Sequence, residues 1–123
     1  MSKLIMFLLV LLALAILFTP KENPPALGSA EYTAQKEKEL KTFVMWQGKE
    51  SVLKILKDKD SAQFDELKVH DKFLCGKVNS KNSFGGYAGF SRFISGATVA
   101  TTDIEQVGSD NGFQQAWELF CTK

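Results

Sequence analysis

Residues 75–93, CGKVNSKNSFGGYAGFSRF, decide the fold that the sequence predicts. They overlap a strand pattern at residues 73–78, in which side chains alternate between two faces. Residues 79–83 favour a turn, because Asn side chains bond their own backbone and tolerate positive φ. Residues 84–94 return as a second strand, which glycines interrupt. We therefore predict an antiparallel hairpin at the centre of the folded domain.

The N-terminal residues differ in kind from the rest. Residues 4–18 are an unbroken apolar run that follows Lys3. Such a run is typical of an export signal or a membrane anchor. As a helix it would reach about 22 Å, against a hydrocarbon core of about 30 Å. Flanking residues, with Lys3 and Lys21 reaching toward the interfaces, would bring it close to spanning.

A cleavable signal carries small residues just after its apolar run. Here residues 19–22 read TPKE, and the nearest suitable sites lie at residues 26–30. We therefore expect residues 1–19 to be an uncleaved, single-pass anchor in the inner membrane. Lys3 precedes the run, which predicts a cytoplasmic N-terminus and a periplasmic body. The alternative is a cleaved signal that releases the body into the periplasm.

Residues 20–29, PKENPPALGS, contain all three prolines of the chain. Proline fixes φ and lacks an amide donor, so this stretch is predicted to be a semi-rigid linker. Residues 30–123 then form one small extracytoplasmic α+β domain.

Both cysteines, Cys75 and Cys121, lie in that domain. An even number of cysteines outside the cytoplasm favours one disulfide, and two buried free thiols are the alternative. A metal site is not expected, because only His70 could join the cysteines and there is no Cys-x-x-Cys pair.

The domain begins with a predicted long helix from Glu31 to about Lys57, with Ser29 as its N-cap. Gly48 interrupts the apolar pattern and indicates a kink, a close contact or a break into two helices. Trp46, just before it, is interpreted as a lid on the core.

Strand patterns follow at residues 62–69, 73–78, 84–94 and 98–107. A short helix over residues 113–121, capped by Asp110 or Asn111, closes the chain. The predicted fold class is α+β: a long helix, a three- to four-stranded antiparallel meander and a short C-terminal helix. Both helices are expected to cover one face of the sheet.

Charge and motifs exclude several functions. Without Lys3, basic and acidic residues are equal in number, so no basic surface for nucleic acid is expected. His70 and the carboxylates Asp65, Glu66, Asp103 and Glu105 are interpreted as surface groups. The glycines of residues 85–89 match no phosphate-binding motif. We expect no enzyme activity, no catalytic residue, no cofactor and no metal.

The central stretch has two interpretations. In the structural one its turn and glycines shape a hairpin, and four aromatic residues fill the core or cover the sheet: Phe84, Tyr87, Phe90 and Phe93. In the functional one glycines let another backbone approach, and polar side chains at the rim recognise a partner. The candidate interaction surface is Asn79, Lys81, Asn82, Tyr87 and Arg92.

Two blocks, LKDKDSAQF at residues 56–64 and residues 75–93, carry a further signal. They resemble small exported or membrane-anchored proteins of bacteria and their phages, with the pattern LKDxxSAxF followed by CGxVNxKNxFGGYxGFxxF. The chain departs from that pattern at Lys59, where the family has proline, and at Lys77, where it has glutamate. The resemblance implies an exported location and this fold.

These features predict a non-enzymatic, membrane-tethered periplasmic protein that contacts another envelope or phage protein. By analogy of architecture, a phage superinfection-exclusion factor would fit the short anchor, the Pro-rich spacer and the disulfide-tied body. The alternative is a cleaved periplasmic or secreted ligand-binding or inhibitor domain, with a pocket beside Tyr87 and Arg92. A third hypothesis, a small hydrolase, would need Asp103, Glu105 or His70 in a cleft.

Overall fold

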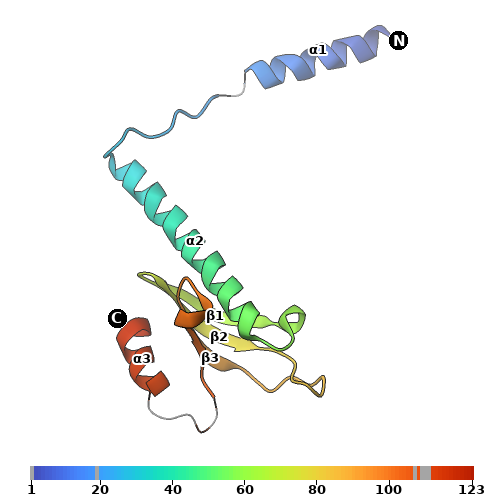
Figure 1. Ribbon diagram of the computed structural model, residues 1–123. Helices are drawn as coiled ribbons and strands as arrows, with labels where there is room; N and C mark the ends of the chain where they lie inside the picture. Colours follow the sequence, from blue (N-terminus) through green and yellow to red (C-terminus); the bar gives the residue numbers. More distant parts are fainter. Residues whose placement is uncertain (1, 19, 107, 109–111) are drawn as a thin grey trace. The chain divides into compact units, whose positions relative to one another are not determined.

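The computed structural model describes residues 2–18, 20–106, 108 and 112–123 (Figure 1). The chain forms two compact units, one up to Thr33 and one over Ala34–Lys123. In the first unit, α1 (Lys3–Leu17) takes up most of the apolar run. Residues 20–26 form neither helix nor strand, in agreement with their prolines. Among the residues that the structure describes, no helix has both the length and the apolar character of a membrane span.

The long helix predicted from the apolar spacing is confirmed as α2 (Ala30–Ile55). It begins in the first unit, where the Tyr32 amide donates to the Ser29 hydroxyl at 3.1 Å, so Ser29 is the N-cap. In the second unit it runs through Gly48 without a break. Its buried residues are Val44, Gly48, Ser51 and Val52, which lie on one face.

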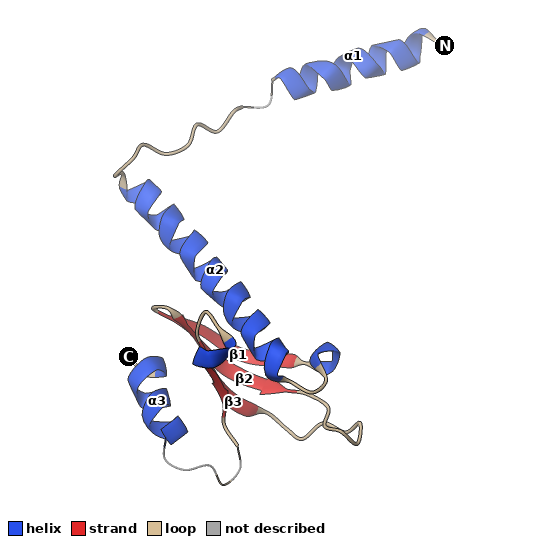
Figure 2. Cartoon of the chain, viewed as in Figure 1, coloured by secondary structure: helices blue, strands red, loops and turns tan. Residues whose placement is uncertain are grey.

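The predicted meander is confirmed as a four-stranded antiparallel sheet in the order β1–β2–β3–β4 (Figure 2). Its strands are β1 (Gln63–His70), β2 (Phe73–Asn79), β3 (Ser91–Ser95) and β4 (Thr102–Ile104). A bulge in β1 between Asp65 and Lys68 puts Glu66 at a φ of 51°. The short helices η1 (Lys59–Ser61) and η2 (Val99–Thr101) precede β1 and β4.

Two strands are much shorter than predicted. In the glycine-interrupted stretch 84–94, residues 84–90 belong to a loop, and pairing with β2 begins only at Ser91, the first residue of β3 (Ser91–Ser95). In the stretch 98–107, Thr98 and Thr101 form a capping box that bends the chain into η2, so the strand is confined to Thr102–Ile104. Val107 and both predicted caps, Asp110 and Asn111, lie outside the described residues.

The two helices cover opposite faces of the sheet, which corrects the prediction that both cover one face. Leu74 and Cys75 are neighbours on β2, so their side chains point to opposite faces. Leu74 packs with Val52 of α2, whereas Cys75 bonds to Cys121 of α3 (Gly112–Cys121). The body is therefore a helix–sheet–helix sandwich with β2 and β3 in its middle layer.

Each face has its own apolar cluster. On the α2 side the buried members are Val52, Leu74, Val78 and Phe93. On the α3 side Cys75, Ile94, Phe113 and Cys121 pack together, with Phe73, Ala116 and Trp117 around them. The predicted disulfide joins Cys75 to Cys121, with 5.9 Å between their Cα atoms. The bond joins the last residue of α3 to the central strand β2.

Candidate interaction site

The connection between β2 and β3, residues 80–90, is a loop with its own hydrogen bonds; we call it the 80–90 loop. Asn82 forms its turn: the Asn82 Oδ1 accepts the amides of Phe84 at 3.0 Å and Gly86 at 3.2 Å. The Asn82 amide also donates to the Gly86 carbonyl at 2.8 Å. Gly85 has a φ of +80°, a value that glycine adopts without strain. The Asn82 side chain is thus a scaffold of the turn.

The base of the loop is held by contacts to β2 and η1. Asn79 is buried, and its Oδ1 accepts the Gly89 amide at 3.1 Å. Ser61 of η1 binds the loop twice: its hydroxyl accepts the Lys81 amide at 2.8 Å, and its carbonyl accepts the Tyr87 hydroxyl at 3.1 Å. The Lys81 ammonium lies 5.8 Å from the centre of the Tyr87 ring. The loop is therefore fixed at both of its ends.

The aromatic side chains of the loop point mostly to solvent. Phe84 is 97% exposed, and Tyr87 and Phe90 are each about half exposed, whereas Phe93 on β3 is fully buried. The prediction that all four fill the core or cover the sheet is therefore wrong for Phe84. A period-two pattern buries alternate residues only where the chain is a strand, and the 80–90 loop leaves the sheet. Aromatic residues are enriched at protein–protein interfaces relative to the rest of a protein surface.

Arg92 is engaged elsewhere. It lies on β3, and its guanidinium donates to both carboxylate oxygens of Glu105, at 2.8 Å and 2.6 Å. It also donates to Gln114 of α3 at 2.8 Å and lies 4.9 Å from the centre of the Trp117 ring. Arg92 therefore connects the α3 side of the sheet to the helix, apart from the 80–90 loop.

This ion pair shifts the pKa of both side chains. Hydrogen bonds from Arg92 lower the pKa of the Glu105 carboxyl; partial burial opposes the shift, and charge attraction adds to it. The same hydrogen bonds raise the pKa of Arg92. Glu105, one of the carboxylates of the hydrolase hypothesis, is thus held as an ion-pair partner.

Of the five candidate surface residues, the structure brings four together. Asn79, Lys81, Asn82 and Tyr87 belong to the loop or its base, but most of their polar groups bond within the body. What the loop presents outward is Phe84, with Phe90 and the Tyr87 ring partly exposed. The sequence analysis did not predict that the polar groups of the loop bond inward while its aromatic rings face solvent. The sequence feature that indicated a loop is the density of glycine at positions 85, 86 and 89, which is too high for a regular strand.

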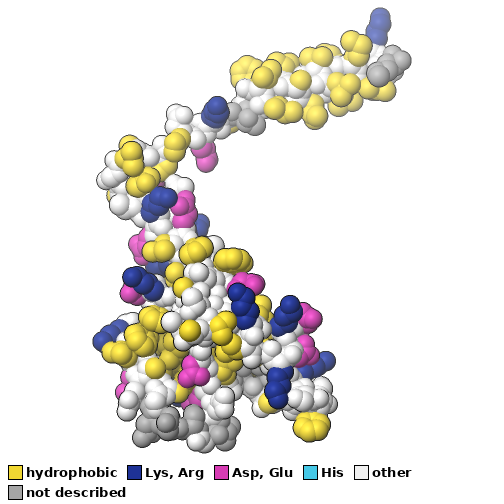
Figure 3. Space-filling view, in the orientation of Figure 1, with side chains coloured by type: hydrophobic (Ala, Val, Ile, Leu, Met, Phe, Trp, Pro, Cys, Tyr) yellow, Lys and Arg dark blue, Asp and Glu magenta, His cyan; other side chains and the backbone are white. Residues whose placement is uncertain are grey.

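A second aromatic pair lies exposed on α2. Trp46 is 60% exposed and its ring centre is 6.3 Å from that of Phe43. The prediction of a lid on the core is wrong, because Trp46 lies two positions from both Val44 and Gly48 and so points away from the buried face. In the space-filling view hydrophobic side chains gather on exposed parts of this helix (Figure 3).

Among the remaining polar candidates, Glu66 and His70 line the same cavity. The Glu66 carboxylate pairs with the Lys77 ammonium at 2.9 Å, and the Asp65 carboxylate accepts the Glu66 amide at 2.8 Å. The His70 Nδ1 lies 3.0 Å from the Lys123 carbonyl oxygen. Among the described residues, no three His, Cys, Asp or Glu side chains are grouped as metal ligands.

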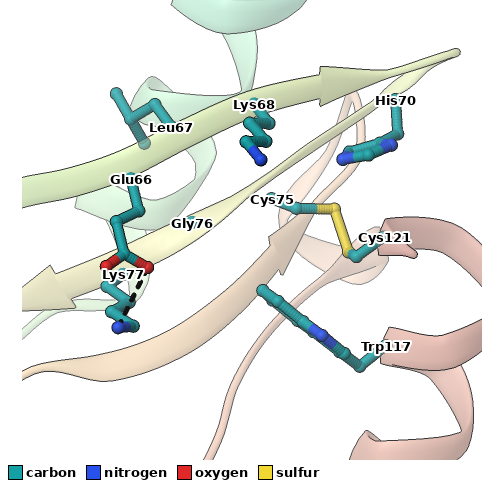
Figure 4. A pocket seen from close by; sticks show the side chains of 9 residues that line it. All are labelled: Glu66, Leu67, Lys68, His70, Cys75, Gly76, Lys77, Trp117 and Cys121. Atoms are coloured by element: carbon teal, nitrogen blue, oxygen red, sulfur yellow. Dashed lines mark ion pairs between the residues drawn. A yellow bond between two sulfur atoms is a disulfide. The ribbon is translucent and has the colours of Figure 1, made fainter. Parts of the chain in front are cut away.

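A cavity of about 290 Å³ lies between the β1–β2 edge and α3 (Figure 4). Its walls include Lys68 and His70 of β1, the Cys75–Cys121 disulfide and Trp117 of α3. The sequence hypothesis placed a pocket beside Tyr87 and Arg92, neither of which lines this cavity. Such a position depends on how α3 covers its face of the sheet, and residue patterns do not encode that.

Comparison with models of protein families, with curated proteins and with solved structures finds no match to this chain.

Proposed function

We propose that this chain is an exported, non-enzymatic module that acts by binding another protein through its 80–90 loop. The observation that carries the proposal is the Phe84 ring, which is 97% exposed. It lies in a turn whose backbone is held by hydrogen bonds to the Asn82 side chain. Ordering a loop on binding costs conformational entropy, and a loop that is already ordered avoids most of that cost. An aromatic side chain presented in this way can enter a pocket of a partner as an anchor.

The location rests on the disulfide and on the apolar N-terminal run. The Cys75–Cys121 bond indicates an oxidising compartment outside the cytoplasm. For the N-terminus we propose an uncleaved anchor in the inner membrane. Its fifteen-residue α1 is short, so the bilayer would thin locally and flanking lysines would reach toward the interfaces. The periplasmic body would then be held by the linker at residues 20–29.

An envelope or phage protein is the proposed partner. The resemblance of residues 56–64 and 75–93 to exported bacterial and phage proteins supports this class of partner. A superinfection-exclusion factor, which blocks entry of a second phage from the envelope, is the specific role that the tethered architecture favours. A host strain that carries the gene would then resist infection by related phages, and the Phe84→Ser variant would lose that resistance.

Site-specific photo-crosslinking in intact cells tests the interaction. A photoreactive phenylalanine analogue replaces Phe84 in one variant of the full chain and the exposed Trp46 in a matched variant. We expect a discrete adduct from position 84 that is absent from position 46, and mass spectrometry would identify the partner. Equal adducts from both positions, or none from position 84, would contradict the proposal.

Cell fractionation tests the anchor separately. We expect the full-length chain in the inner-membrane fraction, resistant to extraction by salt or carbonate. A soluble periplasmic product whose N-terminus lies near residues 28–31 would overturn the tether and favour the cleaved form. That outcome would leave the role of the 80–90 loop intact, because the loop belongs to the body in either case.

A ligand-binding domain is the second candidate function, and the cavity beside Trp117 is the observation that favours it.

A further inference from the structure

The cavity beside α3 is lined by apolar groups and by several charged side chains. The Trp117 indole extends from α3 below the Cys75–Cys121 disulfide in this view, and both line the cavity (Figure 4). Lys68 and His70 extend from β1 on the opposite side. Small-molecule sites have this composition, mostly apolar with a few polar groups that orient the ligand.

The charges that line the cavity are not balanced. Glu66 forms an ion pair with Lys77 at 2.9 Å, and the two charges offset each other. Lys68 lines the same cavity, and in the part of the chain that the structure describes its ammonium has no carboxylate within ion-pair distance. The cavity therefore offers one uncompensated positive charge, which favours an anionic group at this position.

Neighbouring side chains hold the Trp117 indole in place. Arg92 lies 4.9 Å from the centre of the Trp117 ring, and Phe113 stacks with it at 6.1 Å between ring centres. Arg92 is itself held by Glu105 and Gln114. A flat apolar group entering the cavity thus meets an aromatic surface that needs no rearrangement, which lowers the entropy cost of binding.

The volume limits the size of the ligand. A space of about 290 Å³ equals roughly ten water molecules at about 30 Å³ each. It is at the lower end of the range for small-molecule sites, so a ligand of about ten non-hydrogen atoms fits.

We propose that this cavity binds small carboxylates that carry an aromatic ring, with the carboxylate at the Lys68 ammonium and the ring against Trp117 and the disulfide. The site is separate from the 80–90 loop and does not depend on a protein partner.

Fluorescence of Trp117 tests the proposal directly. The full chain carries Trp46→Phe, so that Trp117 is the one indole left, and it is kept in detergent micelles. Titration with 3-phenylpropionate is expected to give a saturable change in emission. The neutral isostere 3-phenylpropionamide is expected to bind about fivefold or more weakly, the loss of a partly exposed ion pair.

A matched pair of lysine variants locates the carboxylate. Lys68→Met removes an ammonium from the cavity lining and is expected to weaken 3-phenylpropionate binding about fivefold. Lys72→Met removes an exposed lysine from the neighbouring turn, outside the cavity lining, and is expected to leave binding unchanged. Both variants share the same micelles, so partitioning of the ligand into detergent cancels between them.

Three results would overturn the proposal: no saturable response, equal affinity for the acid and the amide, or equal effects of the two lysine variants. Thermal unfolding of each variant accompanies the titrations. Because Lys68 and Lys72 are both exposed, unfolding temperatures within about 2 °C of the parent chain are expected.

Discussion

Gly48 of α2 lies against Leu74 of β2 so closely that a Cβ atom at position 48 would be 2.6 Å from the Leu74 Cβ. The Gly48 carbonyl also accepts the Ser95 hydroxyl of β3 at 2.8 Å. Of the three interpretations of this mid-helix glycine, a kink, a close contact or a break, the close contact is therefore the one that the fold uses. The contact sets the distance between α2 and the sheet.

Replacing Gly48 with alanine should therefore destabilise the body. Alanine favours a helix over glycine by about 1 kcal/mol, but overpacking against Leu74 is expected to cost about 1–3 kcal/mol. Urea unfolding of the full chain would measure the difference. Thr42→Ala, at an exposed position of the same helix, is the control and should change stability by less than about 0.5 kcal/mol. A Gly48→Ala chain more stable than wild type would contradict the packing argument.

The disulfide should supply a large share of the stability of α3. The bond closes a loop with a sequence separation of 46 residues, for which the chain-entropy model gives about 4 kcal/mol. The Cys75→Ser/Cys121→Ser double variant should therefore unfold at a much lower urea concentration than the oxidised chain. Adding a reductant should lower the midpoint of wild type to that of the variant and leave the variant unchanged. Equal midpoints for oxidised wild type and the variant would show that the bond adds no stability.

The elements that local patterns determine could be predicted from the sequence. The apolar spacing of α2, the alternation in β2 and the two cysteines gave the α+β class, the meander and the disulfide, because each depends on periodicity or pairing within the chain. The faces could not be assigned in the same way. Leu74 and Cys75 point to opposite sides of β2, but nothing local says which side each helix covers.

The candidate site shows a second limit of prediction from the sequence. The sequence predicts Trp46 as a lid on the core, and its structural interpretation has Phe84 fill the core or cover the sheet. The burial of Val44 and Gly48 puts Trp46 on the outer face of α2, and this could have been read from the helical period. For Phe84, the glycines at positions 85, 86 and 89 indicated that the strand would break, but the direction of the ring also depends on the turn in which the Phe84 and Gly86 amides donate to the Asn82 side chain.

Two phenylalanines nine positions apart should therefore respond differently to truncation. Phe93 is fully buried and packs edge-to-face on Phe64, with 5.8 Å between ring centres. Phe93→Ala is expected to cost about 3–5 kcal/mol. Phe84→Ala is expected to change stability by less than about 0.5 kcal/mol. Chemical denaturation of the two variants checks this, and a large loss of stability in Phe84→Ala would mean that the ring packs in the fold.

Trp46 should behave as a surface residue as well. Trp46→Ala removes a large side chain but leaves no cavity, so its effect on unfolding should be within about 1 kcal/mol. Val52→Ala, on the buried face of the same helix, should cost more, because Val52 contacts the core on the α2 side. If Trp46→Ala were the more damaging of the two, α2 would have to pack on the sheet through its other face.

The Arg92–Glu105 pair should make stability depend on pH in a defined direction. The pKa of Glu105 is lower in the folded chain than in the unfolded one, because Arg92 donates hydrogen bonds to the carboxylate. The stabilisation is therefore fully present above the pKa of an unfolded glutamate, about 4.3. It is lost as the pH falls through the lower folded pKa. Both side chains are partly exposed, which limits the contribution to about 1 kcal/mol.

Comparison of wild type with Glu105→Gln isolates the contribution of the Arg92–Glu105 ion pair to the free energy of unfolding. The difference in unfolding free energy between the two chains should be constant near pH 6–7 and should narrow as the pH falls below about 4.3. Glu50→Gln, at an exposed position of α2, is the control; acids shared by both chains cancel in the difference. A gap between wild type and Glu105→Gln that stays constant down to pH 3 would mean that Arg92 does not stabilise the ionised carboxylate. The contacts of Arg92 with Gln114 and Trp117 would then hold α3 without help from the ion pair.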